Sequence, residues 1–107
     1  MPEVVCHDVY SAIADPTRRQ VLGILAGGER SVTSLTSHFT VTRPAVSKHL
    51  AILKEAGLVT ERKIGRERRY RLRAEPLQEV RDWTERFERF WMGKLNALEE
   101  HLEKSEP

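Results

Sequence analysis

The stretch 42–58, TRPAVSKHLAILKEAGL, gathers side chains that combine positive charge with hydrogen-bonding groups. Arg43, Ser47, Lys48 and Lys54 fall on one side of a helix drawn through this stretch. Their guanidinium, hydroxyl and ammonium groups donate hydrogen bonds to phosphate oxygens and to base edges. The amino-terminal end of this side has no bulky apolar group, as a helix that enters the major groove of DNA requires. The pattern favours a nucleic-acid contact, and the alternative is an ordinary amphipathic surface helix.

The same stretch carries the signals of the helix that must position these side chains. Thr42 suits the N-cap, because its hydroxyl can accept a free amide hydrogen of the first turn. Pro44 lies in that turn, where a missing N–H costs little, and Gly57 can adopt the left-handed conformation that ends a helix. The inward side is an apolar stripe at helical spacing, formed by Ala45, Val46, His49, Leu50 and Leu53.

A second concentration of positive charge follows this helix. Residues 62–73, RKIGRERRYRLR, hold seven basic side chains and one acid. The hydrophobic period changes here from helical to two, which predicts strands over 58–64 and 68–73 and a hairpin loop over 65–67. Edge strands also carry charge to prevent aggregation, but that explanation predicts mixed signs. The hairpin is therefore interpreted as a wing, 58–73, that meets phosphate.

Shorter helices are predicted ahead of residue 42. The first spans 4–14, and the second begins with Asp15 as N-cap and Pro16 as first helical residue. Ser31 can cap a third helix over 32–38. Two helices joined by a few residues, the second with polar groups outward, form a helix-turn-helix over 31–56.

A long helix is predicted over 75–103, bent or interrupted near Gly93, with apolar and aromatic residues stepping by 3 and 4. It would be roughly 40 Å long, and so small a domain cannot cover its stripe from within. An uncovered stripe indicates a partner surface, and the simplest partner is a second copy related by a two-fold axis. The predicted dimerisation segments are 1–14 and 75–104. Their expected contacts are Val5, Val9, Tyr10, Trp83, Phe87, Trp91, Leu95 and Leu98.

Composition excludes several other classes of protein. The 107 residues suit one domain, and a formal net charge of +2 says little by itself. No nucleophile–base pair, glycine-rich phosphate loop or carboxylate pair predicts an enzyme or a bound cofactor. No apolar run approaches the ~20 residues that span a bilayer, and no secretory signal is visible, so a cytoplasmic protein is expected.

No metal site is predicted either, because a zinc site needs three or four ligands. Cys6, His7, His38 and His101 are scattered singles. The lone Cys6 excludes a disulfide within the chain and is interpreted as a small buried side chain; the alternative is a disulfide between chains that responds to oxidation.

Taken in order, the chain resembles the ArsR-type winged-helix repressors. The resemblance rests on IADPTRRQVLGIL, RPAVSKHLAILKEAGLV and GRERRYRL, which together cover most of the sequence. It implies a single winged helix-turn-helix domain over 1–107, mainly α with a small β-hairpin, in the order α-α-α-α-β-β-α. It also implies a homodimer that binds operator DNA, an inverted repeat, and represses transcription.

By matching positions, the resemblance implies DNA contacts from two segments. In the recognition helix they come from Thr42, Arg43, Pro44, Ser47, Lys48 and His49. In the wing they come from Arg66, Arg68 and Arg69.

Departures from the family pattern place the chain in a subgroup without metal ligands. The third helix reads SLTSHF where metal-sensing members have a cysteine-rich box, and the last helix has His101 without paired ligands. A metal- or redox-sensing repressor, or a winged-helix module that binds protein instead of DNA, remains as an alternative. The sequence assigns no inducer.

Overall fold

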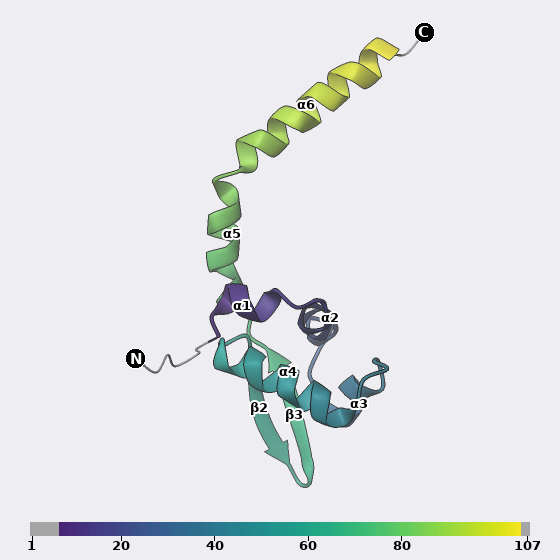
Figure 1. Ribbon diagram of the computed structural model, residues 1–107, viewed down its shortest axis with the longest axis vertical. Coiled ribbons are helices and arrows are strands. Elements are labelled where there is room, and N and C mark those ends of the chain that lie inside the picture. Colours follow the sequence, from purple (N-terminus) through teal and green to yellow (C-terminus); the bar gives the residue numbers. More distant parts are fainter. Residues whose placement is uncertain (1–6, 106–107) are drawn as a thin grey trace.

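The computed structural model describes residues 7–105, apart from the side chains of residues 96, 100 and 103–105. Val5 and Cys6 therefore lie outside the described residues. Four helices and a three-stranded antiparallel sheet form a head, and two further helices lead away from it (Figure 1). The expected class, mainly helical with a small β element, is confirmed.

A side-chain cap sets the start of each helix in the head. In each case a carboxylate or hydroxyl oxygen accepts the backbone N–H three residues further along the chain. Such bonds satisfy amide hydrogens that have no partner within the helix. The caps are Asp8 for α1 (Val9–Ile13), Asp15 for α2 (Pro16–Leu25), Ser31 for α3 (Val32–Thr36) and Thr42 for α4 (Arg43–Glu55). The first helix, expected over 4–14, thus begins at Val9, because Asp8 caps it there.

Helix α4 ends at Gly57, as predicted. Gly57 has a φ of +77°, a conformation that is strained for residues with a side chain. The Leu58 N–H donates to the Leu53 carbonyl at 2.9 Å, and the Gly57 N–H donates to the Lys54 carbonyl at 3.0 Å. This pair of bonds is the Schellman motif, and it turns the chain directly into the sheet.

The sheet has the order β1-β3-β2, in which β2 (Val59–Ile64) and β3 (Glu67–Leu72) are the predicted hairpin. Ile64 lies opposite Glu67, so the connecting loop is one residue shorter than expected. The additional strand β1 (Arg30–Ser31) was not predicted. It is two residues long and exists through its pairing with β3, so it has no period of its own to detect.

Helix α4 lies at the centre of the head and packs on α1, α2, α3 and β2. Its inward residues Val46, Leu50 and Leu53 are fully buried, as the apolar stripe predicts. They meet a core drawn from every element of the head except β1, formed with Val9, Ala12, Val21, Leu22, Leu25, Val32, Leu35, Leu58, Val59 and Tyr70.

The long carboxy-terminal helix of the prediction is two helices, α5 (Leu77–Glu85) and α6 (Glu88–Ser105). The interruption is at residues 86–87, whereas the helix continues through Gly93. Backbone bonds tighten there, from the Arg86 N–H to the Trp83 carbonyl and from the Phe87 N–H to the Thr84 carbonyl. The turn brings the ring of Phe87 within 5.2 Å of the Trp83 ring. Aromatic packing therefore accompanies a break that no glycine or proline marks.

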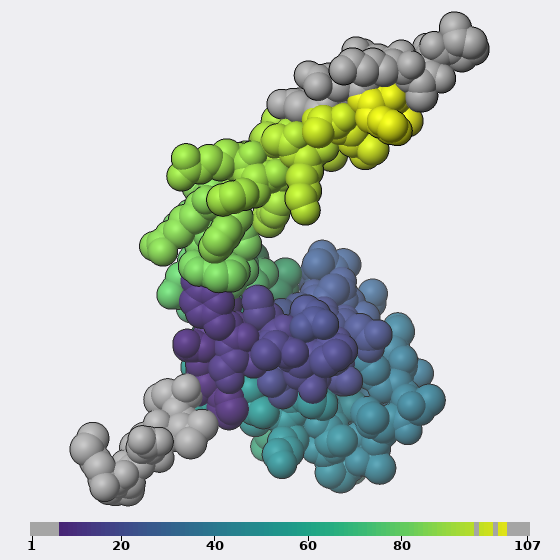
Figure 2. All heavy atoms as spheres, turned by 45° about the horizontal axis from the view of Figure 1, so that its top comes forward, coloured from purple at the N-terminus to yellow at the C-terminus, as the bar shows by residue number. Residues whose placement is uncertain are grey.

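The two helices differ in how they meet the head. Helix α5 contacts α1, where Tyr10 donates a hydrogen bond to the Glu79 carbonyl at 3.1 Å. Helix α6 extends away as an arm, which gives the molecule principal extents of 64 × 42 × 23 Å (Figure 2). Every described side chain of α6 is exposed.

The cap of α2 predicts an acid-dependent loss of stability. Asp15 accepts the Arg18 N–H at 3.0 Å, and this hydrogen bond lowers the pKa of the carboxyl below its usual 3.8. Because the pKa is lower in the folded chain, the stabilisation is complete above the unfolded value and is lost as the pH falls through the folded value. Asp15→Ala should therefore lower the free energy of unfolding by about 1 kcal/mol at neutral pH.

Denaturant unfolding over a series of pH values measures this effect. Asp15→Asn is the matched control, because asparagine caps about as well as aspartate and does not titrate. A destabilisation by Asp15→Ala that persists unchanged at pH values well below 3.8 would contradict the assignment.

Candidate nucleic-acid interface

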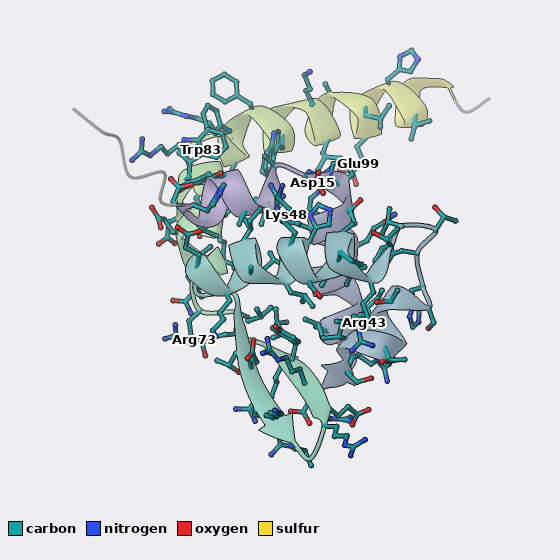
Figure 3. The ribbon with its side chains drawn as sticks, turned by 60° about the horizontal axis from the view of Figure 1, so that its bottom comes forward. Asp15, Arg43, Lys48, Arg73, Trp83 and Glu99 are labelled. Carbon is teal, nitrogen blue, oxygen red and sulfur yellow. The ribbon has the colours of Figure 1, made fainter. Side chains whose placement is uncertain are left out.

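The outward face of α4 presents the polar residues that the sequence singled out. Thr42, Arg43, Pro44, Ser47 and Lys48 are all exposed. Figure 3 shows Arg43 beside the first turn of α4 and Lys48 further along the same helix. Burial of the opposite face in the core fixes the rotation of the helix, so this face is held outward.

The hairpin places a basic residue at its tip. Gly65 has a φ of +62° and is followed by Arg66 in a two-residue turn. Glycine at the first position of such a turn gives a twist that matches the two strands. Arg66 therefore projects from the end of the wing, in the position where the sequence predicts a phosphate contact.

Register separates the remaining basic residues of the wing into two sets. Arg68 pairs with Lys63, and two residues along the strands Tyr70 pairs with Glu61, so these four share one face of the hairpin. Arg69 lies on the opposite face. Two neighbouring arginines that the resemblance groups together thus have different surroundings.

Arg69 is held by carboxylates within the chain. Its guanidinium lies 3.3 Å from Glu29 and 3.0 Å from Glu67. Arg62 binds Glu29 through two bonds of 2.7 and 2.9 Å. The Arg62 hydrogen bonds and charge, followed by those of Arg69, lower the pKa of the Glu29 carboxyl. Arg69, expected to contact DNA, therefore joins the wing to the turn before β1.

His49 is also occupied within the chain. Its Nδ1 lies 3.4 Å from the Arg18 guanidinium and 3.9 Å from the Asp15 carboxylate, and the side chain is 22% exposed. Arg18 in turn donates to the carbonyls of Ala12 and Ser11 at 2.7 and 3.2 Å. This cluster connects α4 to α1 and α2, and its geometry suits a positioning role for His49 better than a base contact.

Several cations in the described residues have no carboxylate within 4 Å. Two lie on α4, at Arg43 and Lys48, and three lie on the wing, at Lys63, Arg66 and Arg71; none of the ion pairs found includes them. Free cations are the groups that can neutralise phosphate. The two elements expected to touch DNA thus carry unneutralised positive charge.

Sequence reasoning missed Glu61, whose carboxylate lies between the helix and the wing. It accepts a 2.6 Å hydrogen bond from the Tyr70 hydroxyl and lies 3.7 Å from Lys54 and 4.0 Å from Arg68. The Tyr70 hydrogen bond, followed by the charges of Lys54 and Arg68, lowers the pKa of Glu61. Burial, followed by Glu61, raises the pKa of Tyr70 to about 12. The alternation of side chains along the strands was the one available signal for this pairing.

The residues expected at a dimer interface divide into two groups. Val9 is 3% exposed and belongs to the core of its own chain, so it is not available to a partner, and that expectation is wrong. Tyr10 is half-buried and lies 6.2 Å from Trp83, ring centre to ring centre. Trp83, Phe87, Trp91, Leu95 and Leu98 are 40–57% exposed.

The described residues contain no group of three or more His, Cys, Asp and Glu side chains arranged to hold a metal ion. Within the same part of the chain, every helix is too short or too polar to cross a membrane.

Comparison with known proteins identifies the family. Residues 15–61 match the model of the bacterial regulatory proteins of the arsR family. Transcriptional repressor SdpR of Bacillus subtilis is 36% identical over 81 residues, covering 76% of this chain and 90% of that protein. HTH-type transcriptional regulator Rv2034 of Mycobacterium tuberculosis is 41% identical over 88 residues, covering 82% and 79%.

A solved structure agrees with these sequence matches. The crystal structure of a "possible transcriptional regulator for arsenical resistance" superposes with a TM-score of 0.68 at 42% identity, covering 89% of this chain and 94% of that chain. The chain belongs to the ArsR family of bacterial regulatory proteins, and is a DNA-binding transcriptional regulator and not an enzyme.

Proposed function

We propose that this regulator is a homodimeric repressor that binds an inverted-repeat operator and does not respond to metal ions. The observation that carries the proposal is the free positive charge on the outward face of α4 and on the wing, with Arg43, Lys48 and Arg66 as its centre. The exposed Ser47 between two cations adds a group that can hydrogen-bond to a base edge. Thr42, Pro44 and Arg68 complete the contact surface.

The dimer is supported by the apolar arm. Trp91, Leu95 and Leu98 fall on one side of α6 and are 54–57% exposed. Each would contribute on the order of 1.5–3 kcal/mol if buried. An arm beside the head offers this stripe to an identical stripe, as a two-fold axis requires. We therefore assign α5 and α6, with Tyr10 of α1, to dimerisation.

Two-fold symmetry explains how a weak reader becomes a tight one. A single α4 offers few base contacts, but a dimer presents two copies on one face. Helices that enter successive major grooves lie roughly 34 Å apart, and their operator is an inverted repeat.

Metal independence is supported by the ligand inventory. Soft metals select several thiolates, and this sequence has one cysteine. The name of the arsenical-resistance relative refers to that protein; the residues here favour a different signal, which they do not identify. The alternative, a winged-helix module that binds protein instead of DNA, leaves the free cations without a partner.

The two contact elements should fail in different ways. Ser47→Ala should lower discrimination between operator and random duplex by about 1–3 kcal/mol, because it removes a base contact. Arg66→Ala should weaken binding to both duplexes and flatten the salt dependence by about one unit, because it removes a phosphate contact. Fluorescence anisotropy at several salt concentrations, on an operator selected from genomic fragments, measures both. Loss of specificity in Arg66→Ala with an intact salt slope would contradict this division.

The arm should be required for tight binding. Leu95→Glu places a charge in the stripe and should yield folded monomers whose operator affinity falls at least tenfold, about 1.4 kcal/mol. Lys94→Glu is the matched control, because it puts the same residue one position away and off the stripe. Sedimentation equilibrium gives the oligomeric state, and circular dichroism confirms folding. A monomeric Leu95→Glu protein with wild-type affinity would remove the dimer from the mechanism.

Added metal should not change DNA binding. Protein treated with a chelator should bind operator with the same affinity before and after zinc is restored, because no described cluster supplies the ligands. The measurement is a titration of labelled operator in both conditions. A tenfold change, about 1.4 kcal/mol of coupling, would show that the protein senses metal.

A further inference from the structure

A groove of about 450 Å³ separates α4 from the wing. Ser47 and Lys54 line it on the helix side, Arg68 and Glu61 line it on the wing side, and the Tyr70 ring lies between them. Ser47 also belongs to the outward face of α4, so the groove continues the surface that we propose for DNA. A cavity with two cations and two hydroxyl groups suits a phosphate, except for the carboxylate that shares it.

The carboxylate is fixed and the cations are not. Glu61 is 22% exposed, and the 2.6 Å bond from the Tyr70 hydroxyl holds it against a 5%-exposed ring. Lys54 and Arg68 are 56% and 62% exposed and remain 3.7 and 4.0 Å from Glu61. By contrast, Arg62 lies 2.7 Å from Glu29. The long distances and exposed side chains allow Lys54 and Arg68 to exchange one anion for another.

We infer that this groove is a subsite for a DNA backbone phosphate, contacted by Lys54 and Arg68, and that Glu61 is an internal counter-ion that competes with it. The inference rests on the proposed function and deepens it, by adding Lys54 as a contact and Glu61 as a residue that limits affinity. Because phosphate is the same in every sequence, Glu61 weakens binding to all DNA. It thereby reduces the fraction of the regulator that is held at sites other than the operator.

The test is Glu61→Gln in the full-length protein. Glutamine keeps the shape and can still accept the Tyr70 hydrogen bond, so the fold should be retained, and thermal unfolding checks this. Anisotropy titrations use an operator duplex and a random duplex across several salt concentrations. Glu61→Gln should tighten both, and should steepen the slope of log affinity against log salt by about one unit.

Two further variants make the result specific. Glu85→Gln removes the same charge from α5, where Glu85 forms an equally loose pair with Arg81 at 3.9 Å; it should leave the slope unchanged. Lys54→Gln combined with Glu61→Gln should remove most of the gain, because the phosphate then loses its helix-side contact.

Each outcome decides between the possibilities. An unchanged slope in Glu61→Gln, or an equal change in Glu85→Gln, overturns the subsite while leaving the proposed function intact. A gain that survives the loss of Lys54 overturns the assigned contact. A wild-type protein that binds every duplex equally overturns the proposed operator function, and the slopes still decide the subsite.

Discussion

Burial of one face of α4 is the constraint on which the rest of the structure depends. Val46, Leu50 and Leu53 are fully enclosed, and each contributes on the order of 1.5–3 kcal/mol. The same helix packs on three other helices and on β2, so its rotation is determined by the core. The polar face then points outward without any interaction of its own to hold it there. Stability and recognition therefore use opposite sides of one helix.

The features that the sequence predicted well are determined by residues close together in the chain. A cap such as Asp15 or Thr42 acts on an amide three residues away, so side-chain type and spacing suffice to identify it. The stripe that α4 buries repeats within two turns, and the hairpin alternates over six residues. Outward placement of Arg43 and Ser47 follows from the same periodicity.

The features that the sequence did not reveal depend on residues far apart in the chain. Strand β1 exists because Arg30 meets Tyr70 across the sheet. Arg69 looks like its neighbour Arg68 in the sequence, yet Glu29, 40 residues away, pairs with it alone of the two. Val9 has the same apolar character as a true interface residue, and only the packing of α1 on the head distinguishes them. Through-space partners of this kind leave no periodic signal.

The arm also has a consequence for how the regulator is controlled. Helix α6 buries none of its described side chains, and an isolated helix of its length is marginal in water. If a second copy completes it, the ordering of α6 and the assembly of the pair obey mass action. The cellular concentration of the regulator then becomes a signal in its own right. Halving the supply of chains would lower the active species more than twofold, so changes in synthesis or degradation would alter gene control without any ligand.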